Sequence, residues 1–528
     1  MVNKERIEAL RKQKAEMKLG GGADRIERQH QRGKLSVWER IEYFFDPGTF
    51  VEVGGYIELR ADFFGVGRMK KPGDGVVTGF GRVNGRLVYC AAQDFTIIGG
   101  SLGEMHGKKI AAVMDMAVQN GAPMVTLNDS GGARIQEGIA SMFGYGEIFY
   151  RNTQASGVIP QISVIMGPCA GGAVYSPGIT DFVVMVRDTS QMFITGPEVI
   201  KTVTGEQVSM EELGGPDVHM KRSGVVCHVG EDDESTLDWV KKLLSYLPSN
   251  NLEAPPVLTS SVSPNEDFEA EVRSRLDHVV PSNPNKPYDM LEVIDLILDQ
   301  GSFVELQDEY AKNIIIGLAR LGGHTVGVVA NNPKELAGCI DVNASDKAAR
   351  FVRFCDAFNI PLVTLVDVPG FLPGTDQEYA GIIRHGAKLL YAYSEATVPK
   401  TTVILRKSYG GAYICMCSKH LGADYVAAWP GAEIAVMGPK GATNIVFRRE
   451  IQKVRDEGGD EEAVAAKTAE CEQEYSDEFA NPRVAAALGY VDDVIEPNQT
   501  RDMLLMHISA LTGKQQDGPK RKHGNIPL

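Results

Sequence analysis

This chain of 528 residues lacks features that mark several classes of protein. No apolar run reaches the roughly 18 to 20 residues that a membrane-spanning helix needs, so we expect a soluble protein. The first residues mix charges and show no basic stretch followed by an apolar one. A secretory signal is therefore not indicated, and we expect a cytoplasmic location.

Cysteine is sparse and never has CxxC spacing. The eight cysteines lie in apolar surroundings, which favours buried free thiols in a reducing compartment over disulfides or zinc. Cys415 and Cys417 could in principle bind a metal ion. Because no His or Cys cluster accompanies them, we interpret them as core residues and expect no metal in this chain.

Positive charge and nucleotide-binding motifs are also scarce. Lys and Arg number 54 against 69 Asp and Glu, which gives a net charge of −15 and argues against a surface for nucleic acid. The patterns G-x-x-x-x-G-K-[ST] and H-E-x-x-H are missing, so P-loop nucleotide hydrolysis is not indicated and no zinc-protease signature is present. Any anionic ligand must be held by local groups.

What the chain does contain is an internal repeat. Three pairs of segments match in the same order along the two halves: 48–53 with 301–306, 121–132 with 359–370, and 171–175 with 410–413. One match would be chance, but three in one order indicate a duplicated domain. Two copies of one fold can provide two versions of the same kind of binding site.

Each half alternates strands, glycine turns and helical patterns, which predicts βα crossover units and an α/β fold class. Proline is concentrated between the halves and indicates a linker. We predict a first domain over 1–255, a linker over 256–287, a second domain over 288–512 and a tail over 513–528. A charged stretch without counterpart in the first half, 448–478, is predicted to be a solvated helical excursion.

Two glycine turns follow buried strands at matching places in the repeat. One contains Gly171 and Gly172, and the other is Gly410, Gly411 and Ala412. The first N–H groups of a helix have no intrahelical acceptor, so such a turn attracts a negative oxygen and can form an oxyanion hole. A single turn of this kind would suggest close packing; two at equivalent sites favour a function.

Side-chain candidates are fewer. Ser101 lies in a G-x-S-x-G sequence between a strand and a helix, as a hydrolase nucleophile does, so a serine hydrolase is the rival hypothesis. The equivalent site, Gly338 to Asp341, keeps the turn but has no serine, so we interpret Ser101 as structural. Asp129 and Asp367 end equivalent strands, which suits helix capping at least as well as catalysis. His385 is a possible general base but is more typical of a packed histidine.

Four strings of residues resemble the carboxyltransferase subunits of biotin-dependent acyl-CoA carboxylases. They are Asp129 to Glu137, Gly167 to Pro177, Phe193 to Pro197 and Tyr409 to Tyr413. The resemblance covers essentially the whole chain. The relatives it suggests are propionyl-CoA carboxylase beta chains, methylmalonyl-CoA decarboxylase alpha chains and methylmalonyl-CoA transcarboxylases.

The resemblance implies two duplicated crotonase-like domains, with each active site shared between the first domain of one subunit and the second domain of another in a hexamer. Gly171 and Gly172 would hold the enolate oxygen of the acyl-CoA thioester, and Gly411 with Ala412 would hold the ureido oxygen of biotin. The further residues that it assigns to binding of acyl-CoA and biotin are Gly131, Gly132, Ala133, Arg134, Gly410, Tyr413 and Ile414.

The resemblance also implies the partners and the chemistry. Carboxybiotin would supply the carbon dioxide that joins the α-carbon of a short-chain acyl-CoA such as propionyl-CoA, giving methylmalonyl-CoA. The chain has no biotinylation sequence and no ATP-dependent carboxylating domain. A biotin carboxylase and a biotin carboxyl carrier, or membrane subunits of a decarboxylase, would therefore act in trans. Many propionyl-CoA carboxylases have Asp in place of Ile414, and an apolar residue also occurs in decarboxylase, transcarboxylase and broad acyl-CoA carboxylase relatives, so the preferred acyl-CoA stays open. The direction of transfer also stays open, because the partners would set it.

The negative net charge sets a condition on coenzyme binding. A chain with charge −15 that binds a polyanionic coenzyme should gather basic side chains at the mouth of the site. Arg134, which follows Gly131 and Gly132, is the first candidate, and Lys108 and Lys109 are further candidates.

Overall fold

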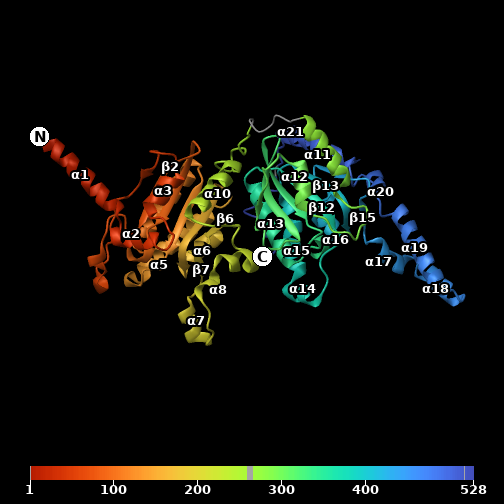
Figure 1. Cartoon of the computed structure of the whole chain (residues 1–528), viewed down its shortest axis with the longest axis horizontal. Helices are drawn as coiled ribbons and strands as arrows, with labels where there is room; N and C mark the ends of the chain where they lie inside the picture. Colours follow the sequence, from red (N-terminus) through yellow and green to blue (C-terminus); the bar gives the residue numbers. More distant parts are fainter. Residues whose placement is uncertain (1, 259–265, 517) are drawn as a thin grey trace. The chain divides into compact units, whose positions relative to one another are not determined.

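The computed structural model describes residues 2–258, 266–516 and 518–528, which form two compact units (Figure 1). Unit 1 comprises Met1–Pro255 with Gln307–Tyr310, and unit 2 comprises Pro256–Leu306 with Ala311–Leu528. Within the described ranges, no helix is both long and apolar enough to cross a membrane.

Unit 1 is built on one eight-stranded sheet with the strand order β1-β2-β3-β4-β5-β6-β8, and β7 pairs with β5. The strands are β1 (Val51–Glu52), β2 (Val76–Val83), β3 (Arg86–Gln93), β4 (Met124–Ser130), β5 (Gln161–Ala170), β6 (Phe182–Val186), β7 (Gln191–Phe193) and β8 (His228–Gly230). The helices are α1 (Val2–Lys18), α2 (Ala23–His30), α3 (Val37–Phe44), α4 (Glu104–Asn120), α5 (Ile139–Ala155), α6 (Gly172–Ile179), α7 (Pro197–Thr204), α8 (Met210–Gly214), α9 (Pro216–Val218) and α10 (Asp233–Tyr246).

Unit 2 repeats this plan, with the order β9-β10-β11-β12-β13-β14-β16 and β15 paired with β13. The strands are β9 (Val304–Leu306), β10 (Ile314–Leu321), β11 (His324–Asn331), β12 (Leu362–Val368), β13 (Lys400–Tyr409), β14 (Tyr425–Ala428), β15 (Glu433–Ala435) and β16 (Asp493–Val494). The helices are α11 (Glu266–Val279), α12 (Met290–Ile297), α13 (Val342–Ala357), α14 (Thr375–Ala380), α15 (Ile382–Glu395), α16 (Gly410–Cys415), α17 (Pro439–Val446), α18 (Arg448–Asp456), α19 (Glu461–Glu478), α20 (Pro482–Ala487) and α21 (Thr500–Leu511).

The two sheets correspond strand by strand and in register. In unit 1, Tyr89 of β3 is paired with Met124 of β4, and in unit 2 Gly327 of β11 is paired with Leu362 of β12. Both β4–β5 and β12–β13 have a register shift near their carboxyl ends. The predicted duplicated α/β fold is therefore confirmed. The correspondence places the two glycine turns at equivalent positions, after β5 and after β13.

The central strands are buried because helices cover the faces of the sheet. All positions of β10 and β12 are buried, and β13 is exposed only in part at one position. Such uninterrupted burial is expected for strands that are packed on both faces of a sheet. The core thus fixes the strand ends from which the glycine turns project.

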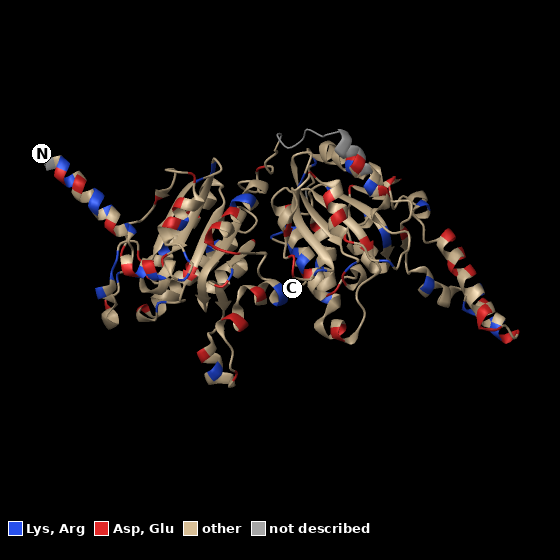
Figure 2. Ribbon diagram, viewed as in Figure 1, with Lys and Arg blue, Asp and Glu red and all other residues tan. Residues whose placement is uncertain are grey.

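One region differs in detail from the sequence-based prediction. The stretch 256–287, predicted to be a linker, contains α11, whose Leu276 is buried in the hydrophobic core of unit 2. An amphipathic helix within the proline-rich segment explains this difference. The excursion over 448–478 is helical as predicted, and α18 and α19 carry charges of both signs along their length (Figure 2).

Candidate functional site

The first glycine turn joins β5 to α6. Gly171 has φ 61°, a left-handed conformation that suits glycine, and its N–H donates to the carbonyl of Phe193 at 3.1 Å. Gly172 and Ala173 begin α6, and their N–H groups have no acceptor in the described chain. The donors available to a ligand are therefore those of Gly172 and Ala173. The N–H of Gly171 already donates to β7, so its predicted bond to the oxyanion would have to replace this contact and stays a prediction.

The ring of Tyr145 packs against this turn and supports it. A Cβ atom added to Gly172 would lie 2.9 Å from the Tyr145 ring, so the backbone packs directly on the aromatic face. Tyr145 belongs to α5 and is only 3% exposed. A glycine at position 172 thus permits the close approach, and the buried ring holds the amides in place.

The second glycine turn joins β13 to α16 in the same way. Gly410 has φ 58°, close to the value at Gly171. The N–H groups of Gly411 and Ala412 lie in the first turn of α16 and have no acceptor in the described part of unit 2. Both predicted donors of this turn therefore lack an acceptor, although Ala412 itself is fully buried. The positive end of the helix favours negative charge at this place.

An aromatic ring also flanks the second turn, but it comes from a different element. Phe371 lies in the loop after β12, and its ring would be 3.9 Å from a Cβ on Gly411 and 2.9 Å from one on Gly386. In unit 1 the place equivalent to Phe371 is Ala133, since both form the same short bridge with the preceding segment. The two turns thus have the same backbone and different surroundings, which suits two different ligands.

The residues that follow Gly411 on α16 line the same turn. The phenol of Tyr413 lies 3.5 Å from Nε2 of His420, and burial raises its pKa to about 12. Ile414 is 38% exposed. Tyr413 and Ile414 are therefore neighbours of the free amides, as predicted, although their contacts with a ligand stay a prediction.

The loop after β4 lies beside the first turn. Gly131 donates its N–H to the carbonyl of Gly99 at 2.9 Å, and Gly132 donates to the hydroxyl of Ser130 at 3.2 Å. Gly132 has φ 94°, and a Cβ there would be 2.8 Å from the carbonyl of Ala170 at the end of β5. The N–H of Ala133 has no acceptor in the described chain. This loop therefore adds a third free amide near the first turn.

Arg134 does not offer its charge to a ligand. Its side chain is fully buried, and its Nη1 lies 2.7 Å from the carboxylates of both Asp74 and Glu137. Its Nη2 donates to the carbonyl of Ser101 at 2.8 Å. The prediction that this guanidinium binds CoA phosphates is wrong, because two buried carboxylates already neutralise it.

The two lysine candidates have different positions. The Lys109 ammonium is buried and donates to the carbonyls of Gly73 and Val76, and burial lowers its pKa to about 8. Lys108 pairs with Glu104 on the surface of α4. Lys109 is therefore a structural tie between α4 and β2, and only Lys108 remains accessible.

The structure assigns structural partners to the other side chains singled out in the sequence. The hydroxyl of Ser101 donates to the carbonyl of Ile98 at 2.7 Å. Asp129 and Asp367 do not cap helices. Asp129 forms buried ion pairs with Lys34 and Arg40, and Asp367 forms one with Arg406. His385 lies 2.8 Å from a carboxylate oxygen of Asp346 on α13.

Cys415 and Cys417 are both buried, and burial raises the pKa of the Cys417 thiol to about 11. Across the described ranges, no group of three His, Cys, Asp or Glu side chains is placed to hold a metal ion.

Comparison with known proteins identifies the family. The family model described as "Carboxyl transferase domain" matches residues 28–526. The chain belongs to the carboxyltransferase family. It is 57% identical, over the whole of both chains, to the propionyl-CoA carboxylase carboxyltransferase subunit of Haloferax mediterranei. It is 55% identical, again over both whole chains, to the methylmalonyl-CoA decarboxylase alpha subunit of Propionigenium modestum.

A solved structure gives the same result in three dimensions. The transcarboxylase 12S structure, determined as a hexamer with methylmalonyl-coenzyme A and methylmalonic acid bound, matches with a TM-score of 0.93 at 51% identity. The match covers 99% of this chain and 98% of that one. The fold of this acyl-CoA carboxyltransferase is thus a pair of crotonase-like domains, and the relatives are named for both directions of transfer. Neither the family nor the contacts of Ser101 support a serine hydrolase.

The two aromatic supports are the part of the site that sequence reasoning missed. Tyr145 and Phe371 occupy non-equivalent positions of the repeat, so alignment of the two halves does not pair them. The signal that was present is the exchange of Ala133 for Phe371 directly after matched glycines. The role of Phe371 as a support becomes clear only in the structure, where its ring lies near Gly411 of α16.

Proposed function

We propose that this carboxyltransferase moves carbon dioxide from carboxybiotin to the α-carbon of a short-chain acyl-CoA, with propionyl-CoA as the substrate and methylmalonyl-CoA as the product. The observation that carries the proposal is the pair of equivalent turns, each with two adjacent backbone amides that lack acceptors. One turn serves the thioester, and the other serves biotin carried by a partner protein.

At the first turn, the N–H groups of Gly172 and Ala173 hold the thioester oxygen. Removal of the α-proton moves charge onto this oxygen, and donors that are already in position stabilise the resulting enolate without reorganising. The N–H of Ala133 is a further donor on the neighbouring loop. No side chain of the first turn is required as a base.

At the second turn, the N–H groups of Gly411 and Ala412 hold the ureido oxygen of biotin. When bound there, carboxybiotin supplies carbon dioxide as its C–N bond breaks, and the freed ring nitrogen accepts the α-proton. The chain fits this group because two amides without acceptors at a helix N-terminus favour negative charge on the oxygen. The enolate electrons then form the new C–C bond with carbon dioxide.

We propose further that six copies assemble, so that unit 1 of one subunit faces unit 2 of another. Exposed apolar side chains lie close to both turns and would be covered in such an assembly. They include Ile139, Met142 and Ile194 in unit 1 and Ile383, Val436 and Met437 in unit 2. The hexamer named for the transcarboxylase 12S relative supports this assignment. A biotin carboxylase and a biotin carboxyl carrier would be the partners.

The reverse transfer is the second candidate. Ile414 sits beside the free amides with 38% of its surface exposed, and an apolar side chain there sets no charge requirement on the acyl chain. A decarboxylase alpha subunit at 55% identity supports the same chemistry run from methylmalonyl-CoA. Only the partners would decide the direction, because the turns stabilise the same oxygens both ways.

The test uses the isolated chain. Methylmalonyl-CoA and free biotin should give propionyl-CoA without ATP, since no carboxylating partner is needed for this half-reaction. The initial rate should rise with both substrates and reach saturation with the acyl-CoA. A chain that hydrolyses the thioester without biotin, or that leaves methylmalonyl-CoA unchanged at any biotin concentration, would contradict the proposal.

A further inference from the structure

The carboxyltransferase site as described has no accessible cation cluster, because Arg134 is neutralised and Lys109 is buried. A different segment of unit 1 supplies one. Residues 60–71, called here the basic–aromatic loop, include η1 (Phe63–Met69) and four exposed basic side chains: Arg60, Arg68, Lys70 and Lys71. None of the four forms an ion pair within the part of the chain that the structure describes.

Two aromatic side chains stand at the tip of this loop. Phe63 is 67% exposed and Phe64 is 93% exposed. Phe64 has φ 50° and Gly65 has φ 75°, so a bulky residue is held in the left-handed region. Val66 is only 1% exposed, so its buried side chain anchors the loop to unit 1. An exposed ring kept in a strained conformation on a fixed base indicates a ligand for that ring.

The loop lies beside the acyl turn. The segment η1 packs against η3 (Ile135–Glu137), which follows the Gly131–Gly132–Ala133 loop by one residue. Arg60 also acts on Glu104 at the start of α4, where its charge helps to lower the pKa of that carboxyl, after the larger effect of Lys108. The basic–aromatic loop therefore packs next to the segment that follows the free amide of Ala133.

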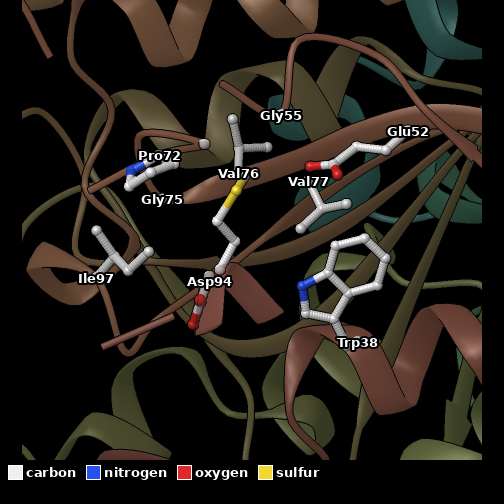
Figure 3. A pocket seen from close by; sticks show the side chains of 11 residues that line it. Trp38, Glu52, Gly55, Pro72, Gly75, Val76, Val77, Asp94 and Ile97 are labelled. Carbon is white, nitrogen blue, oxygen red and sulfur yellow. The ribbon is translucent and has the colours of Figure 1, made fainter. Parts of the chain in front are cut away.

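A small cavity at the base of the loop has the opposite character (Figure 3). Pro72 and Gly73, which follow the loop, line it together with the side chains of Trp38, Glu52 and Asp94. Burial raises the pKa of both carboxyls, so this cavity does not suit a phosphate. Phosphates would instead meet the exposed basic side chains of the loop itself.

We propose that the basic–aromatic loop binds the nucleotide end of coenzyme A. Arg68, Lys70 and Lys71 pair with its phosphates, and the ring of Phe64 stacks on adenine. This inference rests on the proposed function, because it places the coenzyme of the thioester whose oxygen meets Gly172. The loop would supply the local positive charge that a chain of net charge −15 needs for such a substrate.

A membrane surface is the competing ligand, since exposed aromatic rings among basic residues also bind anionic lipid. The position of the loop favours the nucleotide. It packs beside η3, which follows the Gly131–Gly132–Ala133 loop.

The test measures binding of adenosine 3′,5′-bisphosphate, which carries the nucleotide chemistry without the thioester. Three variants are compared by calorimetry: Arg68→Ser with Lys70→Ser and Lys71→Ser, Phe64→Ala, and a matched control with Arg448→Ser, Arg449→Ser and Arg455→Ser on α18. The triple loop variant and Phe64→Ala should each weaken binding about tenfold or more, and the control should not change it.

Kinetics with two thioesters separate the two proposals. The loop variants should raise KM for methylmalonyl-CoA about tenfold and leave KM for a truncated N-acetylcysteamine thioester unchanged. Equal KM values for wild type and loop variants with the full coenzyme, or binding of vesicles containing phosphatidylserine in place of the bisphosphate, would overturn the loop assignment. Wild type without any transfer would instead overturn the proposed function, while bisphosphate binding would still report on the loop.

Discussion

At the scale of single residues, a proline at Gly172 removes one hydrogen-bond donor, and the Tyr145 ring must shift to accept the added Cβ atom. Gly172 is the first residue of α6, a position where proline is well tolerated. Gly172→Pro should lower the turnover number about 10²- to 10³-fold, as the loss of an oxyanion donor does. The assay is transfer from methylmalonyl-CoA to biotin.

The matched control is Gly172→Ala, because it places the same Cβ against the Tyr145 ring and keeps the N–H. It should retain much more activity than the proline variant. Ser101→Ala should keep most activity, since the Ser101 hydroxyl donates to the carbonyl of Ile98 and accepts from Nε of the buried Arg134, and both contacts are structural. Equal losses in the two Gly172 variants, or an inactive but folded Ser101→Ala protein, would argue against catalysis by the amide.

Arg134 illustrates how position in the fold changes the meaning of a residue. Because its buried guanidinium balances Asp74 and Glu137, Arg134→Ala should lower the free energy of unfolding by about 3 to 5 kcal/mol. Urea denaturation followed by circular dichroism measures this. A stable variant whose only defect is a raised KM for acyl-CoA would restore the direct role in phosphate binding.

At the scale of secondary-structure elements, one ring pair ties β8 to α10. His228 stacks on Trp239 with ring centroids 4.4 Å apart, and burial lowers the pKa of His228 to about 4. The folded state therefore holds a neutral imidazole, while the unfolded chain takes up a proton below about pH 6.5. Stability from this group is present above pH 6.5 and is lost as the pH falls towards 4.

The corresponding prediction concerns His228→Phe, which keeps an aromatic ring and removes the titration. Between pH 6.5 and 4 the variant should lose less unfolding free energy than wild type, because the unfolded state no longer gains a proton at this site. The measurement is the urea midpoint across that pH range. Parallel pH profiles for the two proteins would show that His228 makes no contribution.

The elements also show how far the sequence could predict the site. The repeat located both turns after equivalent strands, because glycine pairs after apolar runs leave a direct trace in the sequence. It could not show that Gly171 donates to Phe193, since this bond depends on where β7 returns to β5. The pairing of Arg134 with Asp74 was likewise hidden by a sequence separation of 60 positions. Local patterns predict strands and turns, whereas the partners of polar groups depend on distant segments.

At the scale of the whole molecule, duplication of the domain gives two copies of the same glycine turn, and we propose that each copy binds a different ligand. The left-handed glycines, φ 61° at Gly171 and φ 58° at Gly410, keep the turns nearly identical. The aromatic supports differ, with Tyr145 from α5 in unit 1 and Phe371 from a loop in unit 2. We therefore expect a mutation in the first glycine turn to impair stabilisation of the enolate alone, and a mutation in the second turn to impair binding of biotin alone.

The most direct test co-expresses Gly172→Pro and Gly411→Pro subunits so that they assemble together. Each variant alone should be nearly inactive in transfer from methylmalonyl-CoA to biotin. If each site pairs unit 1 of one subunit with unit 2 of another, random mixing should leave about a quarter of the sites with both turns intact. Recovery of about a quarter of wild-type activity is the predicted result, and mixed oligomers as inactive as either parent would contradict two shared turns.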